Sequence, residues 1–263
     1  MTPILVFDIE TVPDTDGLRE LYDLGRDETA QSIAEIAFQR RRAKTGGDFL
    51  PLHLHRVVAI SCALRDGDQF RVWSLGNGSG DEKELIQRFF DGIEKYTPQL
   101  VSWNGGGFDL PVLHYRGLIH GVSAACYWDT GEKEREFRWN SYIGRYHARH
   151  CDLMDVLALY QPRANAPLDD LAQLMGLPGK LGMDGSKVWE AYLQGELSAI
   201  SNYCETDVAN TYLVYLRFQL MRGQLTPENY RCEVEIVRAT LGASSEPHWR
   251  EFLARWKDEG DHD

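Results

Sequence analysis

The sequence has no long apolar segment and no paired cysteine pattern, and these absences argue against two classes of protein. No stretch approaches the roughly 18 uninterrupted apolar residues of a membrane span, and Asp8 interrupts the N-terminal run where a signal peptide would still be apolar. The five cysteines are scattered and none is spaced Cys-x-x-Cys, which favours neither a disulfide framework nor a thiolate zinc site. We therefore expect a cytoplasmic protein with no membrane partner.

Positive charge is also scarce. The chain has 28 Lys and Arg against 40 Asp and Glu, a formal net charge of −12. A protein that coats duplex DNA relies on a basic surface, so this balance argues against that class, although an enzyme could obtain positive charge from metal ions. Because 43% of the 263 residues are hydrophobic, the chain can bury a substantial core, and we expect one large α/β domain.

Hydrophobic spacing and turn signals divide the chain into strands and helices. Residues 3–7 form a short apolar run ended by Asp8, which predicts a buried strand that delivers acids at its C-terminal end. The Asp66-Gly67 turn predicts a hairpin of strands 56–64 and 69–75, and a further strand is expected at 99–103. Helices are expected at 81–96, 108–121, 168–176, 186–195 and 196–221.

Three segments interrupt this pattern. Residues 14–50 are polar and helix-prone, so we expect a helical insertion within a domain that spans residues 1–221. Residues 126–150 are loop-like and rich in aromatic, Arg and His side chains. Residues 222–263 are expected to form an extension with one helix after Pro227 and an acidic, solvated tail.

Four acids and one tyrosine stand where these elements end or face the core. Asp8 and Glu10 are two residues apart on an extended segment, so their side chains project to the same side. Asp109 follows another strand. Tyr203 and Asp207 are four residues apart on the long helix and are neighbours on one face. A bare Asp-x-Glu could simply cap the next turn, but acids delivered by three separate segments can form a cage for two hard divalent cations.

Two such ions, Mg²⁺ or Mn²⁺, are the machinery of phosphodiester cleavage, in which the ions activate a water molecule and stabilise the departing oxygen. Tyr203 would then lie where its hydroxyl can orient that water. The residues thus indicate a metal-dependent hydrolase of phosphodiesters.

Three motifs resemble those of the DEDD exonuclease superfamily, and most closely those of the proofreading domain of B-family DNA polymerases: Asp8-Ile9-Glu10-Thr11, Asn104-x3-Phe108-Asp109 and Tyr203-x3-Asp207. The resemblance implies a ribonuclease H-like fold, a mixed five-stranded sheet flanked by helices. It also implies the tyrosine subtype, because Asn202 stands where the histidine subtype has His. The remaining chain is too short for a polymerase palm and fingers, so the sequence is similar to stand-alone polymerase-B-like exonucleases of bacteria.

The resemblance also assigns roles. It implies that Asp8, Glu10 and Asp207 bind the first metal ion, that Asp8 bridges to the second, and that Asp109 holds the second ion directly or through water. It implies that Tyr203 positions the water. The residues expected to contact the terminal nucleotides of the substrate strand are Thr11, Val12, Asn104 and Phe108.

Other charged residues have ordinary structural explanations beside functional ones. A basic cluster could follow the backbone of a single strand or could be a solvated helix face: Arg40, Arg41, Arg42 and Lys44. A zinc site could be suggested by His147, His150 and Cys151, but the loop offers no second pair of ligands at the spacing that zinc sites have. Two acids are expected to be caps and two lysines surface residues, although each could border a site: Asp152, Asp155, Lys180 and Lys187.

The sequence therefore predicts a 3′-to-5′ exonuclease that releases nucleoside monophosphates from single-stranded or frayed nucleic acid. We favour DNA over RNA as the substrate, although no motif here recognises the 2′ position that distinguishes them. The motifs name no protein partner. Two alternatives remain open, an inactive nucleic-acid-binding module and a phosphoesterase of small nucleotides or short oligonucleotides.

Overall fold

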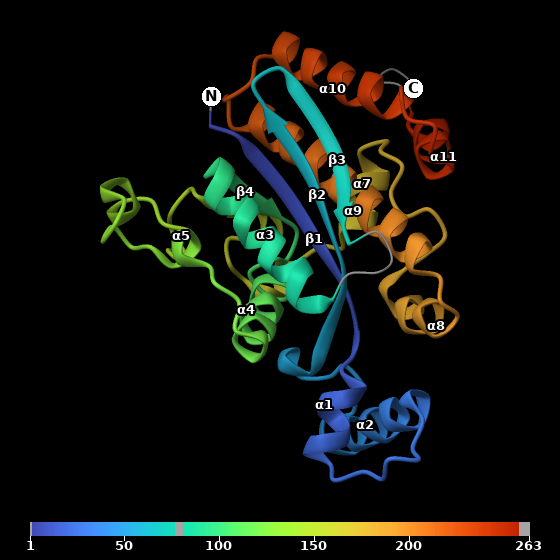
Figure 1. The fold of residues 1–263 in the computed structure, drawn as a ribbon. Coiled ribbons are helices and arrows are strands. Elements are labelled where there is room, and N and C mark those ends of the chain that lie inside the picture. The colour runs from blue at the N-terminus through green and yellow to red at the C-terminus, as the bar shows by residue number, and fades with distance from the viewer. Residues whose placement is uncertain (1, 77–80, 258–263) are drawn as a thin grey trace.

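The computed structural model describes residues 2–76 and 81–257, which form a mixed five-stranded sheet between layers of helices (Figure 1). The strand order is β3-β2-β1-β4-β5. Strands β1, β2 and β3 pair antiparallel, whereas β4 and β5 run parallel to β1. This confirms the expected sheet. The strands are β1 (Ile4–Pro13), β2 (His55–Asp66), β3 (Gln69–Leu75), β4 (Gln99–Ser102) and β5 (His150–Asp152).

Strand β1 is longer than expected, and the prediction that it ends at Asp8 was wrong. It continues to Pro13 because β2 pairs with it along its whole length, with a register shift between Glu10 and Thr11. Its parallel partner β4 pairs only with Ile4–Val6. The acids therefore project from the middle of β1, just beyond the point where β1 loses its neighbour on one side.

Alternating side chains of β1 pack against helices on both faces of the sheet. Leu5, Phe7 and Ile9 share a buried cluster with the helices α3 (Glu82–Tyr96) and α4 (Asp109–His120), beside the short α5 (Ala125–Trp128). Val6 belongs to the opposite cluster, which contains α9 (Leu197–Met221). The period of two in the strand thus fixes which side chains face α9.

The insertion forms two helices, α1 (Thr15–Leu21) and α2 (Ala30–Thr45), at the far end of β1 and β2 (Figure 1). Each has a side-chain N-cap, from Asp14 and Thr29 respectively. The helices bury a small core of their own, which includes Leu18 and Ile33. The insertion was predicted, and its local caps and apolar residues explain why it folds beside the sheet rather than within it.

The segment after α9 forms two helices, α10 (Pro227–Gly242) and α11 (Pro247–Arg255), where a single helix was expected. Ser244 and Glu246 interrupt the helical run, and Pro247 begins the second helix. A nearly buried ion pair of Arg65 with Glu233, at 2.8 Å, fastens α10 to β2. The predicted acidic tail, residues 258–263, lies outside the described residues.

Three short helices lie between β5 and α9: α6 (Leu153–Leu157), α7 (Leu168–Leu174) and α8 (Val188–Leu193). The segment 126–150 is mostly irregular, as expected, apart from the end of α5 and a 3₁₀ turn at Arg135–Arg138. Within residues 2–76 and 81–257, no helix has the length and apolar character needed to cross a membrane.

Candidate active site

The four predicted acids and the tyrosine line one pocket of about 560 Å³. Asp8 and Glu10 come from β1, Asp109 from the start of α4, and Tyr203 and Asp207 from α9. The pocket is completed by residues of the β4–α4 turn, of α6 and α7, and of the loops that adjoin these helices, which include Trp103, Met154, Asp169 and Lys180. Segments up to 199 residues apart thus meet at one place.

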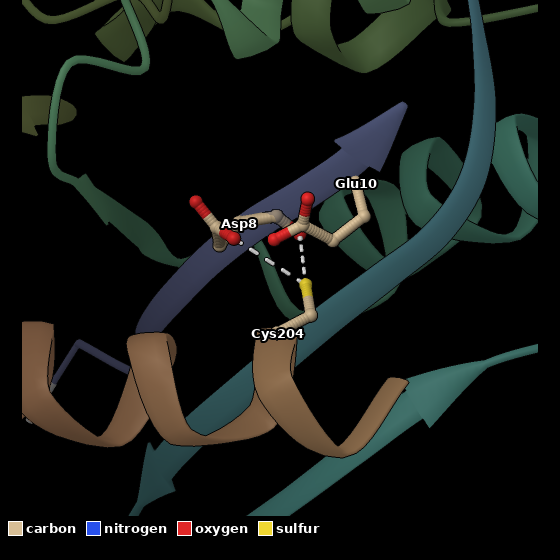
Figure 2. Close-up of side chains that lie close together, drawn as sticks. All are labelled: Asp8, Glu10 and Cys204. Carbon is tan, nitrogen blue, oxygen red and sulfur yellow. Dashed lines mark hydrogen bonds between the residues drawn. The ribbon is translucent and has the colours of Figure 1, made fainter. Parts of the chain in front are cut away.

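Asp8 and Glu10 project from the same side of β1 toward α9 (Figure 2). Cys204 on α9 points at them, and its thiol donates to the backbone oxygen and to Oδ2 of Asp8, both at 3.4 Å. One ligand atom from each of these three residues lies within 4.8 Å of the others. Cys204 was not identified from the sequence, where a buried cysteine is indistinguishable from a small apolar residue.

Asp109 is the first residue of α4, and only 3% of the residue is exposed. Its Oδ1 accepts a hydrogen bond of 3.0 Å from the backbone N–H of Ile9, between the two acids of β1. The chain reaches this position through a tight turn in which Asn104 adopts a left-handed conformation, with φ of 64°, and its carbonyl accepts the N–H groups of Gly107 and Phe108. Asn tolerates that conformation better than most residues.

Tyr203 and Asp207 occupy consecutive turns of α9, and the interaction with the tyrosine hydroxyl lowers part of the rise that burial causes in the pKa of Asp207. The Tyr203 side chain is held by a small cluster that includes Val12, Val188 and Ile200, so that only 7% of the residue is exposed. The phenol is therefore fixed with its polar end at the acids.

The acids are electrostatically unsatisfied. Within the described chain none of the four forms an ion pair with Lys, Arg or His. Burial, and then repulsion from the other three acids, raises the pKa of Asp8 well above its ordinary value. Burial likewise raises the pKa of Glu10, that of Asp109 to about 7 and that of Asp207 to about 6. Buried carboxylates without cations are costly, so this donor set fits divalent cations with oxygen ligands.

Lys180 is the one cation among the described residues that line this pocket. Its amine lies 5.7 Å from the centre of the Tyr203 ring, and its charge lowers the pKa of Glu10 and Asp207. Asn210 on α9 donates a hydrogen bond of 3.0 Å to the carbonyl of Gly179, the residue before Lys180. The sequence singled out Lys180 but could not place it, whereas Lys187 contacts Asp184 and does not line the pocket.

The four residues expected to contact substrate have different surroundings. Asn104 and Phe108 line the pocket. Thr11 lies behind Phe108: its hydroxyl is 2.9 Å from Nδ1 of His55, whose ring meets Phe108 edge-on with centroids 5.4 Å apart. Val12 is only 1% exposed and packs against α8 and α9, so the structure does not bring its side chain to the pocket.

The secondary candidates have structural partners. The Asp152 carboxylate accepts the N–H groups of Asn104 and Gly106, at 2.9 and 2.8 Å, and so fastens the β4–α4 turn to β5. His147 and His150 each contact a serine, and these histidines do not join a cluster of metal-binding side chains in the part of the chain described. The arginines of the basic cluster contact the insertion itself, through Tyr22, the Phe49 carbonyl and Glu35.

Comparison with known proteins connects this geometry to a family. Residues 47–256 match a family model that is described as a predicted 3′-5′ exonuclease related to the exonuclease domain of PolB. The chain belongs to this family. The matched residues include Asp109, Tyr203 and Asp207, whereas Asp8 and Glu10 precede them.

This family member is also similar to the catalytic subunit of DNA polymerase epsilon. It is 28% identical over 148 residues to that of Saccharomyces cerevisiae and 26% identical over 143 residues to that of Emericella nidulans. Each match covers 52% of this chain but only 6% of the polymerase protein. The similarity is thus confined to a small part of those proteins.

The fold is similar to part of the family B DNA polymerase of Pyrobaculum calidifontis. The match covers 84% of this chain and 25% of the polymerase, with a TM-score of 0.50 and 20% sequence identity. This likeness confirms that the mixed sheet with its flanking helices is the ribonuclease H-like fold of the polymerase exonuclease domain.

Proposed function

We propose that this protein is a metal-dependent 3′-to-5′ exonuclease that removes nucleoside monophosphates from single-stranded or frayed DNA. The observation that carries the proposal is the convergence of four buried carboxylates without ion-pair partners and one phenol on a single pocket. Membership of a family related to the PolB exonuclease domain supports the reaction, and the polymerase relatives support DNA as the strand.

The donor set suggests how metal ions would be held. Asp8, Glu10 and Asp207 would hold one divalent ion, and Asp8 and Asp109 a second, either Mg²⁺ or Mn²⁺. When bound, such ions stabilise the negative charge that develops during phosphodiester hydrolysis.

The protein's own groups would position the reactants. Burial, and then the charges of Asp207, Glu10 and Asp8, raise the pKa of Tyr203, so its hydroxyl stays protonated and can donate a hydrogen bond. The same hydroxyl can orient a water molecule at the edge of the acid cluster. Lys180 places a positive charge on the same pocket, where it would attract a phosphate.

A labelled oligonucleotide tests the proposal. A single-stranded DNA labelled at its 5′ end should shorten stepwise in Mg²⁺ or Mn²⁺, and Asp8→Ala or Asp207→Ala should abolish the shortening. Asp170→Ala removes an exposed acid that does not line the pocket and should retain the wild-type rate. Persistent cleavage in both pocket variants would contradict the proposal, as would stoichiometric binding without turnover in Mn²⁺.

A further inference from the structure

A second pocket of about 470 Å³ borders the proposed active site on the far side of the β4–α4 turn. The turn contributes Asn104 and Phe108 to the first pocket and Gly106 and Gly107 to the second. At the start of α6, Met154 lines the first pocket and Asp155 lines the second. A substrate strand that leaves the catalytic acids past this turn would therefore meet the second pocket next.

Four large aromatic side chains line the second pocket. Tyr127 and Tyr142 are buried, whereas Tyr160 is half-buried and Trp128 is 49% exposed. Tyr146, which is 82% exposed, meets the Tyr160 ring edge-on with centroids 5.9 Å apart. Exposed aromatic rings in a groove are the platforms on which single-stranded nucleic acids stack their bases.

The backbone holds Tyr160 in an unusual conformation. Leu159 and Tyr160 both have positive φ, 50° and 58°, although neither is glycine. The Tyr160 N–H donates to the Asp155 carbonyl at 2.7 Å, which closes the turn after α6. Non-glycine residues in this region cost conformational energy and gather at ligand-binding positions. The turn directs the Tyr160 ring to the pocket.

The charge around this pocket suits a nucleic acid strand. Between Phe137 and Cys151 the chain carries three Arg and two His but no acid, whereas the whole chain has a net charge of −12. Arg145 lines the pocket, with its guanidinium 4.9 Å from the centre of the Tyr160 ring. Asp152 is engaged with the β4–α4 turn. Burial, and then the charge of Asp152, raise the pKa of the remaining acid, Asp155, and Arg145 opposes this rise. The lining thus combines aromatic rings with one arginine.

We propose that this second pocket binds the bases of the nucleotides upstream of the scissile bond, so that the protein favours longer single strands over dinucleotides. The inference rests on the proposed exonuclease function and adds the site that recognises the body of the strand. Tyr160 and Trp128 would stack on bases, and Arg145 would contact a backbone phosphate. Neither residue touches the catalytic acids.

Binding and cleavage of oligothymidylates of two lengths test this. Affinity is measured by fluorescence anisotropy in Ca²⁺, and cleavage is measured as kcat/KM in Mn²⁺. Tyr160→Ala and Arg145→Ala should each lower affinity and kcat/KM for a strand of about 15 nucleotides by roughly tenfold, and change those for a dinucleotide by less than about twofold. Tyr160→Phe keeps the ring and should behave as wild type. Arg231→Ala, an exposed arginine on α10, should have no effect.

Equal losses on long and short strands, or full activity of both alanine variants on the long strand, would overturn the proposal. The anisotropy measurement separates it from the proposed catalysis. Length-dependent binding lost in Tyr160→Ala, without cleavage by any variant, would refute the exonuclease and retain the pocket. Cleavage that depends on Asp8 but not on Tyr160 or Arg145 would refute the role of the second pocket and retain the exonuclease. Circular dichroism of each variant verifies that the fold is retained.

Discussion

Replacing Asp109 by Asn should stabilise the protein in the absence of metal ions. Raising the pKa of a carboxyl from about 3.9 in an unfolded chain to about 7 in the native state corresponds to about 4 kcal/mol of destabilisation at high pH. Asn carries no charge, and its Oδ1 can still accept the Ile9 N–H. Because burial of the new amide has its own cost, we expect a gain of about 1 to 3 kcal/mol.

The sign of the effect depends on pH. Below about pH 4 both the native and the unfolded states keep the Asp109 proton, so the substitution gains nothing from charge. Between about pH 4 and 7 the unfolded chain releases the proton while the native state retains it, so the stability of the wild type falls as pH rises. Above pH 7 the penalty is complete, and the advantage of Asp109→Asn should be largest there.

Urea and thermal unfolding in EDTA, at pH values from about 4 to 8, measure this difference. At about 2 to 4 °C per kcal/mol for a chain of this size, Tm should rise by several degrees at pH 8. Mn²⁺ should raise the Tm of the wild type more than that of the variant. A variant that is less stable than the wild type at pH 8, or equally stabilised at every pH, would refute the reasoning.

Two matched substitutions isolate the cause. Asp109→Ala also removes the charge but leaves the Ile9 N–H without its acceptor, which costs about 1 to 3 kcal/mol, so it should be less stable than Asp109→Asn. Asp129 has the opposite environment: the N–H of Glu134, followed by those of Gly131, Lys133 and Glu132, lowers its pKa to about 2. Asp129→Asn should therefore lower Tm.

Three further substitutions test the pocket and the turn beside it. Tyr203→Phe should reduce the cleavage rate on the order of 10- to 100-fold while Mn²⁺ still raises Tm, since no metal-binding acid is lost; an unchanged rate would remove the role of the hydroxyl. Lys180→Gln should raise the pKa of Glu10 and Asp207, so the acid limb of the kcat/KM–pH profile should move to higher pH, and a stationary limb would contradict this. Gly105→Ala should destabilise the protein by about 1 to 3 kcal/mol, because its Cβ would collide with the Ser102 side chain; urea unfolding tests this against Gly47→Ala, whose Cβ meets no atom.

Much of the fold was predictable because its signals are local. The apolar spacing of α3, the Asp66-Gly67 hairpin and the polar insertion each depend on neighbouring residues, and each element is present within a few residues of the expected limits. The acids of the pocket could also be proposed from the sequence, because three separate segments deliver them and one of them stands on an otherwise apolar helix face. Asp207 is the clearest case, since it is flanked by buried apolar residues of α9.

The missing parts depend on contacts between distant segments. The extension of β1 past Asp8 requires β2, whose pairing residues lie about 50 positions away. Cys204 and Lys180 gain their importance only when α9 and the α7–α8 connection lie against β1. The burial of Val12 likewise follows from α8, which covers that end of the strand. No local pattern encodes these neighbours.

The position of the acids in the sheet also explains how a site with such repulsion can be rigid. Beyond Val6, β1 has no parallel neighbour, so its N–H groups on that side need other acceptors. Asp109 supplies one by accepting from Ile9, and in doing so it fixes the distance between α4 and the acids of β1. The carboxylate thus replaces a missing strand and serves as a candidate metal ligand at once. Because both uses require the same oxygen-rich side chain at the same place, the site is built into the central strand where β4 ends, and the hydrogen bond from Ile9 lowers part of the pKa rise that burial causes at Asp109.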